Sequence, residues 1–306
     1  MSTVSVIIPT YNRGHVIAAG LDSLFAQTRP PDEVLVVDDS RTTDDTAKIV
    51  GAYPDTVRYF VQQESGISKA RNLGILRSTG DYLLFLDSDD VMMPDSIEKM
   101  ARTLDENPEF GACYCGYIIT SGPGEVYERS PLDRPSGDVF ALMAREQLCL
   151  HHSVLVRREV LASFGLFDPQ LRHFDDIDFW IRASAVTEFL FIPEHLVEYR
   201  RWGPGASGLD SNYWEAGGIM LDKLRPYHES GRLSARNWKL VKHRFRGHYR
   251  DMWVALAFQA YSRQDWRQAV RYGTRGLLHY PRALTNRGFW AVVVKSALRS
   301  WRVARQ

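Results

Sequence analysis

The sequence is poor in cysteine and has no long apolar run, and both absences narrow the class of protein. Its 306 residues include three cysteines (Cys113, Cys115 and Cys149), which show no metal-ligand spacing and are too few for a disulfide framework. We therefore expect a reducing compartment. No apolar stretch reaches the roughly 18 residues of a membrane-spanning helix, and no basic and apolar leader opens the chain. The expected location is the cytoplasm.

The overall charge of +1 hides two regions of opposite charge. Residues 1–221 carry 19 basic and 33 acidic side chains, whereas residues 222–306 carry 19 basic and 4 acidic side chains. Such a division predicts two parts with different partners.

The first half of the chain alternates short apolar runs with amphipathic stretches, which predicts an α/β fold with a mostly parallel sheet. Strands are expected at 4–9, 33–37, 57–61 and 82–86, with helices at about 14–27, 43–52, 67–78 and 94–106. Further strands are expected at 111–120, 151–156, 188–192 and 196–200, with a loop at 121–138 and a helix at 175–185. The sequence after residue 208 predicts helices at 212–230, 234–261, 264–279 and 284–304.

Three carboxylates, Asp87, Asp89 and Asp90, directly follow the apolar strand at 82–86. They cannot all stay charged and close together without a counter-ion. A divalent cation such as Mn2+ or Mg2+ supplies that charge and can also hold a diphosphate. The alternative is that Asp90 caps a helix, for which one acid suffices.

Polar residues also follow the other expected parallel strands, at Thr10–Arg13 and Asp38–Asp39. Asp38 has the alternative role of capping a helix at 42–50. Ligands of open parallel sheets bind beyond the carboxyl ends of the strands. The sequence therefore predicts one binding site at this edge.

Five segments then give a family resemblance. They are SVIIPTYNR, VLVVDDS, ESGISKARNLGI, GDYLLFLDSDD and FDDIDFWIRA, and their order and spacing resemble family 2 inverting glycosyltransferases, including those of bacterial cell-surface polysaccharides. The resemblance implies a GT-A fold over residues 1–208, with a nucleotide-binding half (1–110) and an acceptor-binding half (111–208), and it implies Mn2+ or Mg2+. The basic helical region (209–306) follows from its own composition and lies outside the match. As substrates we expect a nucleotide-sugar donor, in particular a UDP-sugar, and a glycan or lipid-linked glycan acceptor.

The resemblance assigns a set of residues to the donor. Tyr11 offers an aromatic face to the base, Asp39 accepts from base or ribose, and Arg71 faces a phosphate or the strand-end carboxylates. In the matching DxD motif, Asp89 is the implied metal ligand, with Asp90 as its support or an alternative ligand. The full donor set is Thr10, Tyr11, Arg13, Asp39, Gly66, Arg71, Asp87 and Ser88.

A general base must take the proton of the acceptor hydroxyl as it attacks the sugar. Family members usually have Glu-Asp at the position of Asp175-Asp176, so Asp176 is the implied base. Asp175, Trp180 and His152 are expected on the acceptor side, although an acidic helix start and a core role for Trp180 are open alternatives.

One departure from the family pattern concerns the segment after Tyr199 and Arg200, where many members carry a histidine. This chain has none at 201–207, and Arg200 or Arg201 is expected to bind the diphosphate instead.

Two other functions are compatible with parts of the sequence. A sugar-nucleotide-forming nucleotidyltransferase would share the strand-end acids, but the first strand lacks a Gly-rich phosphate loop. Nucleic-acid binding would use the basic region, but the acidic first part would repel phosphate.

Residues 284–306 interleave Trp, Phe and Val with Arg and Lys, as interfacial amphipathic helices do. They predict a peripheral position on the inner face of the cytoplasmic membrane, with a helical cap on the core and a homo-oligomer contact as alternatives.

We expect the full chain to sediment with anionic liposomes and not with neutral ones. Each Lys or Arg near an anionic surface contributes about 1 kcal/mol, so salt should weaken binding, while burial of Trp290 and Trp301 should keep a remainder. Truncation before Gly288 should abolish sedimentation. An insoluble truncated protein would instead support the helical cap.

Overall fold

The computed structural model describes residues 2–121, 125–200, 212–246, 256–258, 260–279 and 293–297. The chain divides into two compact units, residues 1–206 and residues 207–306.

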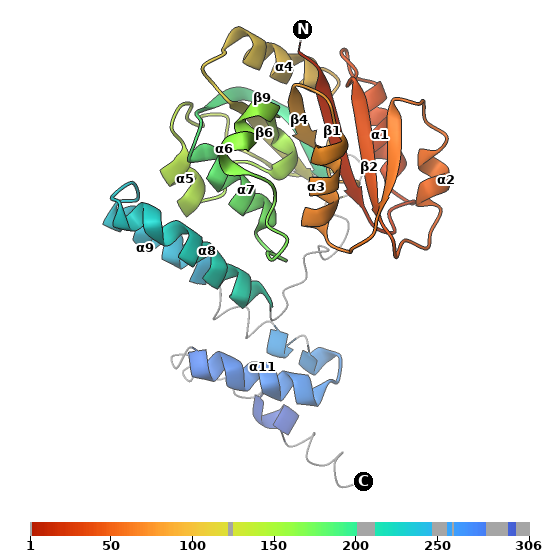
Figure 1. Ribbon diagram of the computed structural model, residues 1–306. Coiled ribbons are helices and arrows are strands. Elements are labelled where there is room, and N and C mark those ends of the chain that lie inside the picture. Colours follow the sequence, from red (N-terminus) through yellow and green to blue (C-terminus); the bar gives the residue numbers. More distant parts are fainter. Residues whose placement is uncertain are drawn as a thin grey trace. The chain divides into compact units, whose positions relative to one another are not determined.

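Within the described part of the first unit, one mixed β-sheet of nine strands runs through the centre, with helices on both faces (Figure 1). The order is β3-β2-β1-β4-β8-β6-β9-β5, and β7 pairs with β6. The strands are β1 (Val4–Thr10), β2 (Glu33–Asp39), β3 (Val57–Gln62), β4 (Tyr82–Phe85), β5 (Val91–Met92), β6 (Ala112–Thr120), β7 (Val126–Arg129), β8 (Val154–Arg157) and β9 (Phe189–Arg200).

Parallel pairing is confined to two parts of this sheet. β1, β2, β3 and β4 are mutually parallel, as expected, and β6 is parallel to β9. The pairs of β4 and β6 with β8, of β5 with β9 and of β6 with β7 are antiparallel. The parallel quartet therefore ends at a common edge, where its strands are followed by the polar residues singled out above.

The side chains of β1 alternate between two apolar layers. Val4, Val6 and Ile8 pack in the same core cluster as α1 (Ile17–Phe25) and α4 (Ser96–Glu106). Ile7 points to the other face, where a Cβ on Gly74 of α3 (Ile67–Arg77) would lie 2.4 Å from its Cγ2. Glycine is thus required for α3 to approach the sheet this closely.

The remaining helices of this unit are short, apart from the helix that carries the expected base. They are α2 (Thr46–Val50), η1 (His151–Ser153), η2 (Arg158–Val160), α5 (Phe140–Arg145), α6 (Leu161–Phe164) and α7 (Asp175–Ser184). On the α7 side of the sheet, Phe85, Phe167 and Phe179 form a compact aromatic group, with Phe167 and Phe179 stacked at 3.9 Å.

Several expected elements differ from the structure. The two strands expected at 188–192 and 196–200 are one strand, β9, because a register shift opposite Gly116 accommodates Pro193 and Glu194. The strand expected from His151 begins at Val154, after a turn of 3-10 helix. The expected loop at 121–138 contains β7, and Val91–Met92 form β5 against β9.

The structure also excludes the two alternative helix-cap roles. Asp38 caps no helix, because α2 begins only at Thr46; its carboxylate accepts bonds from Thr42 and Tyr59 instead. Asp90 precedes β5, and the next helix, α4, begins at Ser96.

The described second unit is helical, as expected. It contains α8 (Asn212–Glu229), α9 (Ala235–Arg246) and α11 (Trp266–His279). The expected helix at 284–304 lies outside the described residues except for 293–297, so Trp290 and Trp301 stay predictions. Among the described helices, none has the length and apolar content needed to cross a bilayer.

Candidate active site

The carboxyl-end edge of the parallel strands brings most of the expected site residues together. In register, Thr10 at the end of β1 pairs with Asp38 of β2, and β4 leads through Leu86 into Asp87–Asp90. Because β8 lies next to β4, the η1 turn that precedes β8 also reaches this edge. Residues from both expected halves thus converge on one site.

Asp39 is the acid of this edge that is most firmly held in its charged form. Its buried carboxylate accepts from the Arg41 guanidinium at 2.8 and 3.1 Å, from Ser65 Oγ at 3.1 Å and from Gln62 Nε2 at 3.3 Å. The hydrogen bonds from Arg41 lower the pKa of Asp39 to about 2. Arg41 also lies 5.1 Å above the ring of Tyr11, which is 47% exposed. An exposed aromatic ring beside an ionised acid suits a planar polar ligand.

The other expected donor residues occupy the same edge in different environments. Thr10 is buried, and its Oγ1 has no partner among the described residues. Ser88 is buried between Asp87 and Asp89. Gly66 has φ +134°, a conformation that favours glycine, and a Cβ there would meet only Lys69 Cγ, at an ordinary contact distance of 4.0 Å. Gly66 is thus required by the backbone rather than by crowding.

Arg71 joins the two halves of the site. Its guanidinium, on α3, donates to Asp87 Oδ1 at 2.9 Å and to Asp175 Oδ2 at 2.7 Å, and the residue is only 3% exposed. Of the two partners expected for Arg71, the structure shows the carboxylates. A buried bidentate cation lets the strand-end acid and the acid at the start of α7 lie close together.

Asp90 and His152 form a buried group with Asp87. One ligand atom from each residue lies within 4.8 Å of the others, a spacing that could accommodate a metal ion. Asp90 is fully buried, and its pKa is raised well above the usual range by burial and by the neighbouring Asp87. Burial lowers the pKa of His152 to about 4, so that its imidazole is neutral at pH 7. Sequence reasoning had placed His152 on the acceptor side.

Asp89 lies apart from this group. Its carboxylate faces Arg13 Nη1 at 3.7 Å, and burial raises its pKa. The assignment of the metal to Asp89 stays a prediction, and the described geometry favours Asp90.

Asp176 sits at the start of α7, where Phe174 adopts a left-handed φ of +63°. A bulky residue in this conformation is strained, and such strain concentrates at functional sites. The Asp176 carboxylate accepts from the Ile177 N–H at 2.8 Å. Burial, followed by repulsion from Asp175, raises the pKa of Asp176 to about 6. A carboxylate tuned in this way suits proton transfer near neutral pH.

Trp180 belongs to the core rather than to the wall of an acceptor pocket. It is 2% exposed and donates from Nε1 to His151 Nδ1 at 3.0 Å. Of its two expected roles, the structure shows packing against the aromatic group. Its hydrogen bond fixes the η1 turn that carries His152 relative to α7.

Arg200 lies at the end of β9, and its guanidinium donates a hydrogen bond to Glu198 at 3.0 Å. Its backbone N–H donates to Asp90 Oδ1 at 2.9 Å. The backbone of this expected diphosphate residue therefore supports the acidic group. Arg201 and the segment up to 207 lie outside the described residues.

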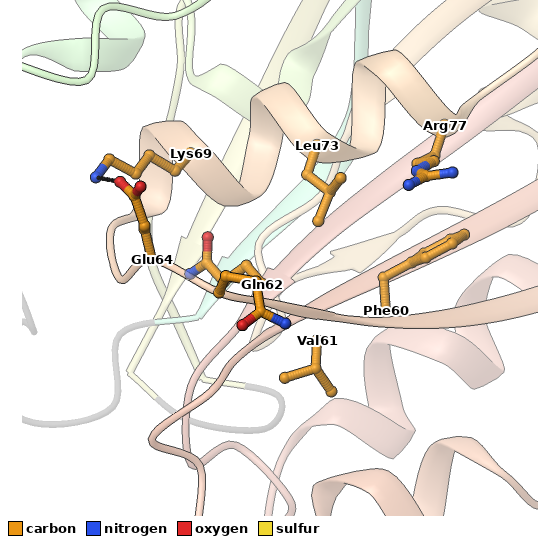
Figure 2. Close-up of a pocket in the computed structure, with 8 residues that line it drawn as sticks. Phe60, Val61, Gln62, Glu64, Lys69, Leu73 and Arg77 are labelled. Atoms are coloured by element: carbon orange, nitrogen blue, oxygen red, sulfur yellow. Dashed lines mark hydrogen bonds and ion pairs between the residues drawn. The ribbon is translucent and has the colours of Figure 1, made fainter.

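A separate pocket of about 410 Å³ lies between β3 and α3 (Figure 2). Its lining is Phe60, Val61, Gln62, Gln63, Glu64, Lys69, Leu73 and Arg77. None of the residues expected to bind donor, metal or acceptor lines it, so this pocket is separate from the predicted donor site.

Comparison with known proteins places this chain in a family. The profile "Glycosyl transferase family 2" matches residues 5–165. The chain therefore belongs to glycosyl transferase family 2. An uncharacterized glycosyltransferase of Rickettsia typhi is 31% identical over 203 residues, which cover 64% of this chain and 63% of that protein. The uncharacterized glycosyltransferase YwdF of Bacillus subtilis is 27% identical over 246 residues, which cover 78% of this chain and 88% of that protein.

Solved structures show the same fold. Residues 1–349 of TarS from S. aureus match with a TM-score of 0.65 at 21% identity, covering 99% of this chain and 92% of that one. TarS 1–349 in complex with UDP-GlcNAc matches with a TM-score of 0.66. The expected GT-A fold is thereby confirmed.

We expect Arg71→Met to destabilise the protein strongly. The substitution leaves the half-buried Asp87 and the buried Asp175 without their cation, and removing one partner of a buried ion pair typically costs about 3–5 kcal/mol. Denaturant unfolding measures the loss.

Arg225→Met is the matched control, since it also removes an arginine–aspartate pair, but one in which the side chains of Arg225 and Asp222 are 54% and 73% exposed. This variant should leave the unfolding free energy nearly unchanged. Equal losses in both variants would contradict a special role for the buried Arg71.

Proposed function

We propose that this chain is a metal-dependent inverting glycosyltransferase, which moves a sugar from a nucleotide sugar to a hydroxyl of a glycan or lipid-linked glycan. We further propose a UDP-sugar as the donor. Family membership supports the reaction class, and the UDP and UDP-GlcNAc complexes of the similarly folded TarS support the nucleotide.

The observation that carries this proposal is the bridge made by Arg71. It connects Asp87, which ends the donor-side strand, with Asp175, which is adjacent to Asp176. A single displacement needs a leaving group on one side of the sugar and a base on the other. The bridge holds residues suited to both tasks in one place.

On the donor side, Tyr11 would stack on the base, and the ionised Asp39 would accept hydrogen bonds from the base or ribose. On the acceptor side, Asp176 would take the proton of the attacking hydroxyl. A pKa of about 6 leaves its carboxylate mostly ionised at pH 7 while keeping it a competent base.

The residues present fit a divalent cation. Asp87, Asp90 and His152 could hold it, and the unpartnered Asp90 Oδ2 and His152 nitrogens are buried without compensation. When bound, such an ion neutralises charge on the departing diphosphate. Arg13, near Asp89, is a second cation that could approach that diphosphate.

A thermal-shift comparison of UDP, GDP, CDP and ADP, each with Mn2+, tests the donor. Binding to the folded state alone adds about 2.7 kcal/mol of stability at one hundred times the dissociation constant. We expect UDP to give the largest shift and Asp39→Asn to reduce it. Asp81→Asn is the matched control, because Asp81 bonds Thr3 ahead of β1, at the opposite edge of the sheet. No shift with any nucleotide would contradict the proposal.

We expect Asp176→Asn to keep the UDP shift while transfer falls by two or more orders of magnitude, since loss of a general base typically costs about 10²–10⁴ in rate. In the unaltered protein, the rate should rise with pH through about 6, as Asp176 loses its proton in a setting shaped by Asp175, Arg71 and Asp87.

Asp178→Asn provides the control on the same helix. Asp178 accepts a hydrogen bond from Arg182 at 2.8 Å, so the asparagine variant should have a lower melting temperature and an unchanged rate of transfer. Normal transfer by the Asp176 variant would show that the base lies elsewhere.

A further inference from the structure

We propose that His152 is a metal ligand, and that it forms with Asp87 and Asp90 a mixed nitrogen and oxygen site that prefers Mn2+ to Mg2+. This inference deepens the proposed function, and it rests on that function only for the role of the metal.

The free ligand atoms of the three residues face a common position. Asp87 Oδ1 accepts a hydrogen bond from Arg71, which leaves Asp87 Oδ2 without a hydrogen-bond partner among the described residues. Asp90 Oδ1 accepts a hydrogen bond from the backbone N–H of Arg200, and Asp90 Oδ2 lies 3.1 Å from His152 Nδ1. Each acid is therefore oriented through one oxygen and has the other available. Together with a ring nitrogen these oxygens lie within 4.8 Å of one another.

Burial makes this arrangement costly without a cation. Asp90 Oδ2 and both nitrogens of His152 are fully buried and have no hydrogen-bond partner of acceptable geometry among the described residues. Buried polar atoms are almost always satisfied, and unsatisfied ones call for a missing partner. The ring of His152 is held in place by stacking on Tyr199, at 5.7 Å between ring centres. A fixed imidazole beside two carboxylates is a donor set for a metal.

The competing explanation is a buried hydrogen bond in which Asp90 and His152 share a proton. That pair would satisfy Asp90 Oδ2 and one nitrogen of His152, and a metal ion would also occupy only one of the two nitrogens. A shared proton, however, would not account for the third member of the group, Asp87. A metal ion accounts for the convergence of all three residues.

The nitrogen ligand determines the preference among metals. Mg2+ is bound mainly by carboxylate oxygens and water, and an imidazole adds little to its affinity. First-row transition ions such as Mn2+ gain more from an imidazole ligand than Mg2+ does. His152 thus supplies the discrimination that two aspartates alone would lack.

Pulsed EPR of Mn2+ added to the full chain, first alone and then with UDP, tests the ligand directly. In the unaltered protein we expect modulation from a directly bound ¹⁴N nucleus. In His152→Phe this modulation should be absent, although the phenylalanine ring can still stack on Tyr199. His195→Asn is the matched control, since His195 bonds the Ser130 carbonyl outside the group. It should retain the ¹⁴N signal. The concentration of Mg2+ that displaces Mn2+ should be at least about tenfold lower for His152→Phe than for the unaltered protein, because changes around a metal site typically weaken metal binding by about 10–100-fold.

The two nuclei separate this inference from the proposed function. Coupling to ³¹P after addition of UDP reports a bound diphosphate, whereas ¹⁴N coupling reports His152. Phosphorus coupling without nitrogen coupling, or no bound Mn2+ under either condition, overturns the His152 assignment. Nitrogen coupling without phosphorus coupling supports His152 and counts against the nucleotide donor. If His152→Phe fails to fold, the unaltered protein still tests the inference, because missing ¹⁴N coupling there overturns it.

Discussion

The site depends on keeping several carboxylates close together where little water can screen them. Arg71 makes this possible for two of them, because a guanidinium can bond two carboxylates at once in a fixed geometry. Its partners are 16 and 104 residues away in sequence, and one lies in each expected half of the fold. A lysine would offer a single point charge and could not hold both acids in the same way.

The residue after Arg71 extends this arrangement to the acceptor side. Asn72 donates to the Phe167 carbonyl and accepts from the Phe167 N–H, both at 2.9 Å. The loop before α7 is thereby fastened to α3, and the Phe167 ring stacks on Phe179 of α7 itself. One turn of α3 thus sets both the charge and the position of the helix that carries Asp176.

The parallel half of the fold could be predicted from the sequence because buried parallel strands are continuous apolar runs. The strands expected at 4–9 and 33–37 correspond to β1 and β2, each extended by one or two polar residues into the site. β5 has only two residues, and β7 is exposed throughout, so neither has an apolar pattern to detect. Their existence depends on pairing with distant strands, which a local pattern does not contain.

The same limit applies to the site. Strand-end acids and the acidic start of α7 were visible as short motifs, whereas His152 gave no such signal. Two consecutive histidines before an apolar run are compatible with packing, and only the adjacency of β8 to β4 brings one of them to Asp90. His151 does pack, against Phe85 at 4.8 Å. Successive positions in one turn therefore serve different purposes, which sequence spacing alone cannot separate.

Finally, aspartate side chains at this site have different pKa values because their surroundings differ. Asp39 is held ionised by Arg41, with a pKa of about 2, whereas burial brings Asp176 to about 6. A ligand-binding carboxylate benefits from permanent charge, and a proton acceptor benefits from a pKa near the working pH. Arg71 bonds Asp175 and not Asp176, so its charge lowers the pKa of Asp176 only from a distance and does not offset the effect of burial. Among the described residues, Asp176 accepts a hydrogen bond from the Ile177 N–H, and the rest of its carboxylate would be available to the hydroxyl that we propose it deprotonates.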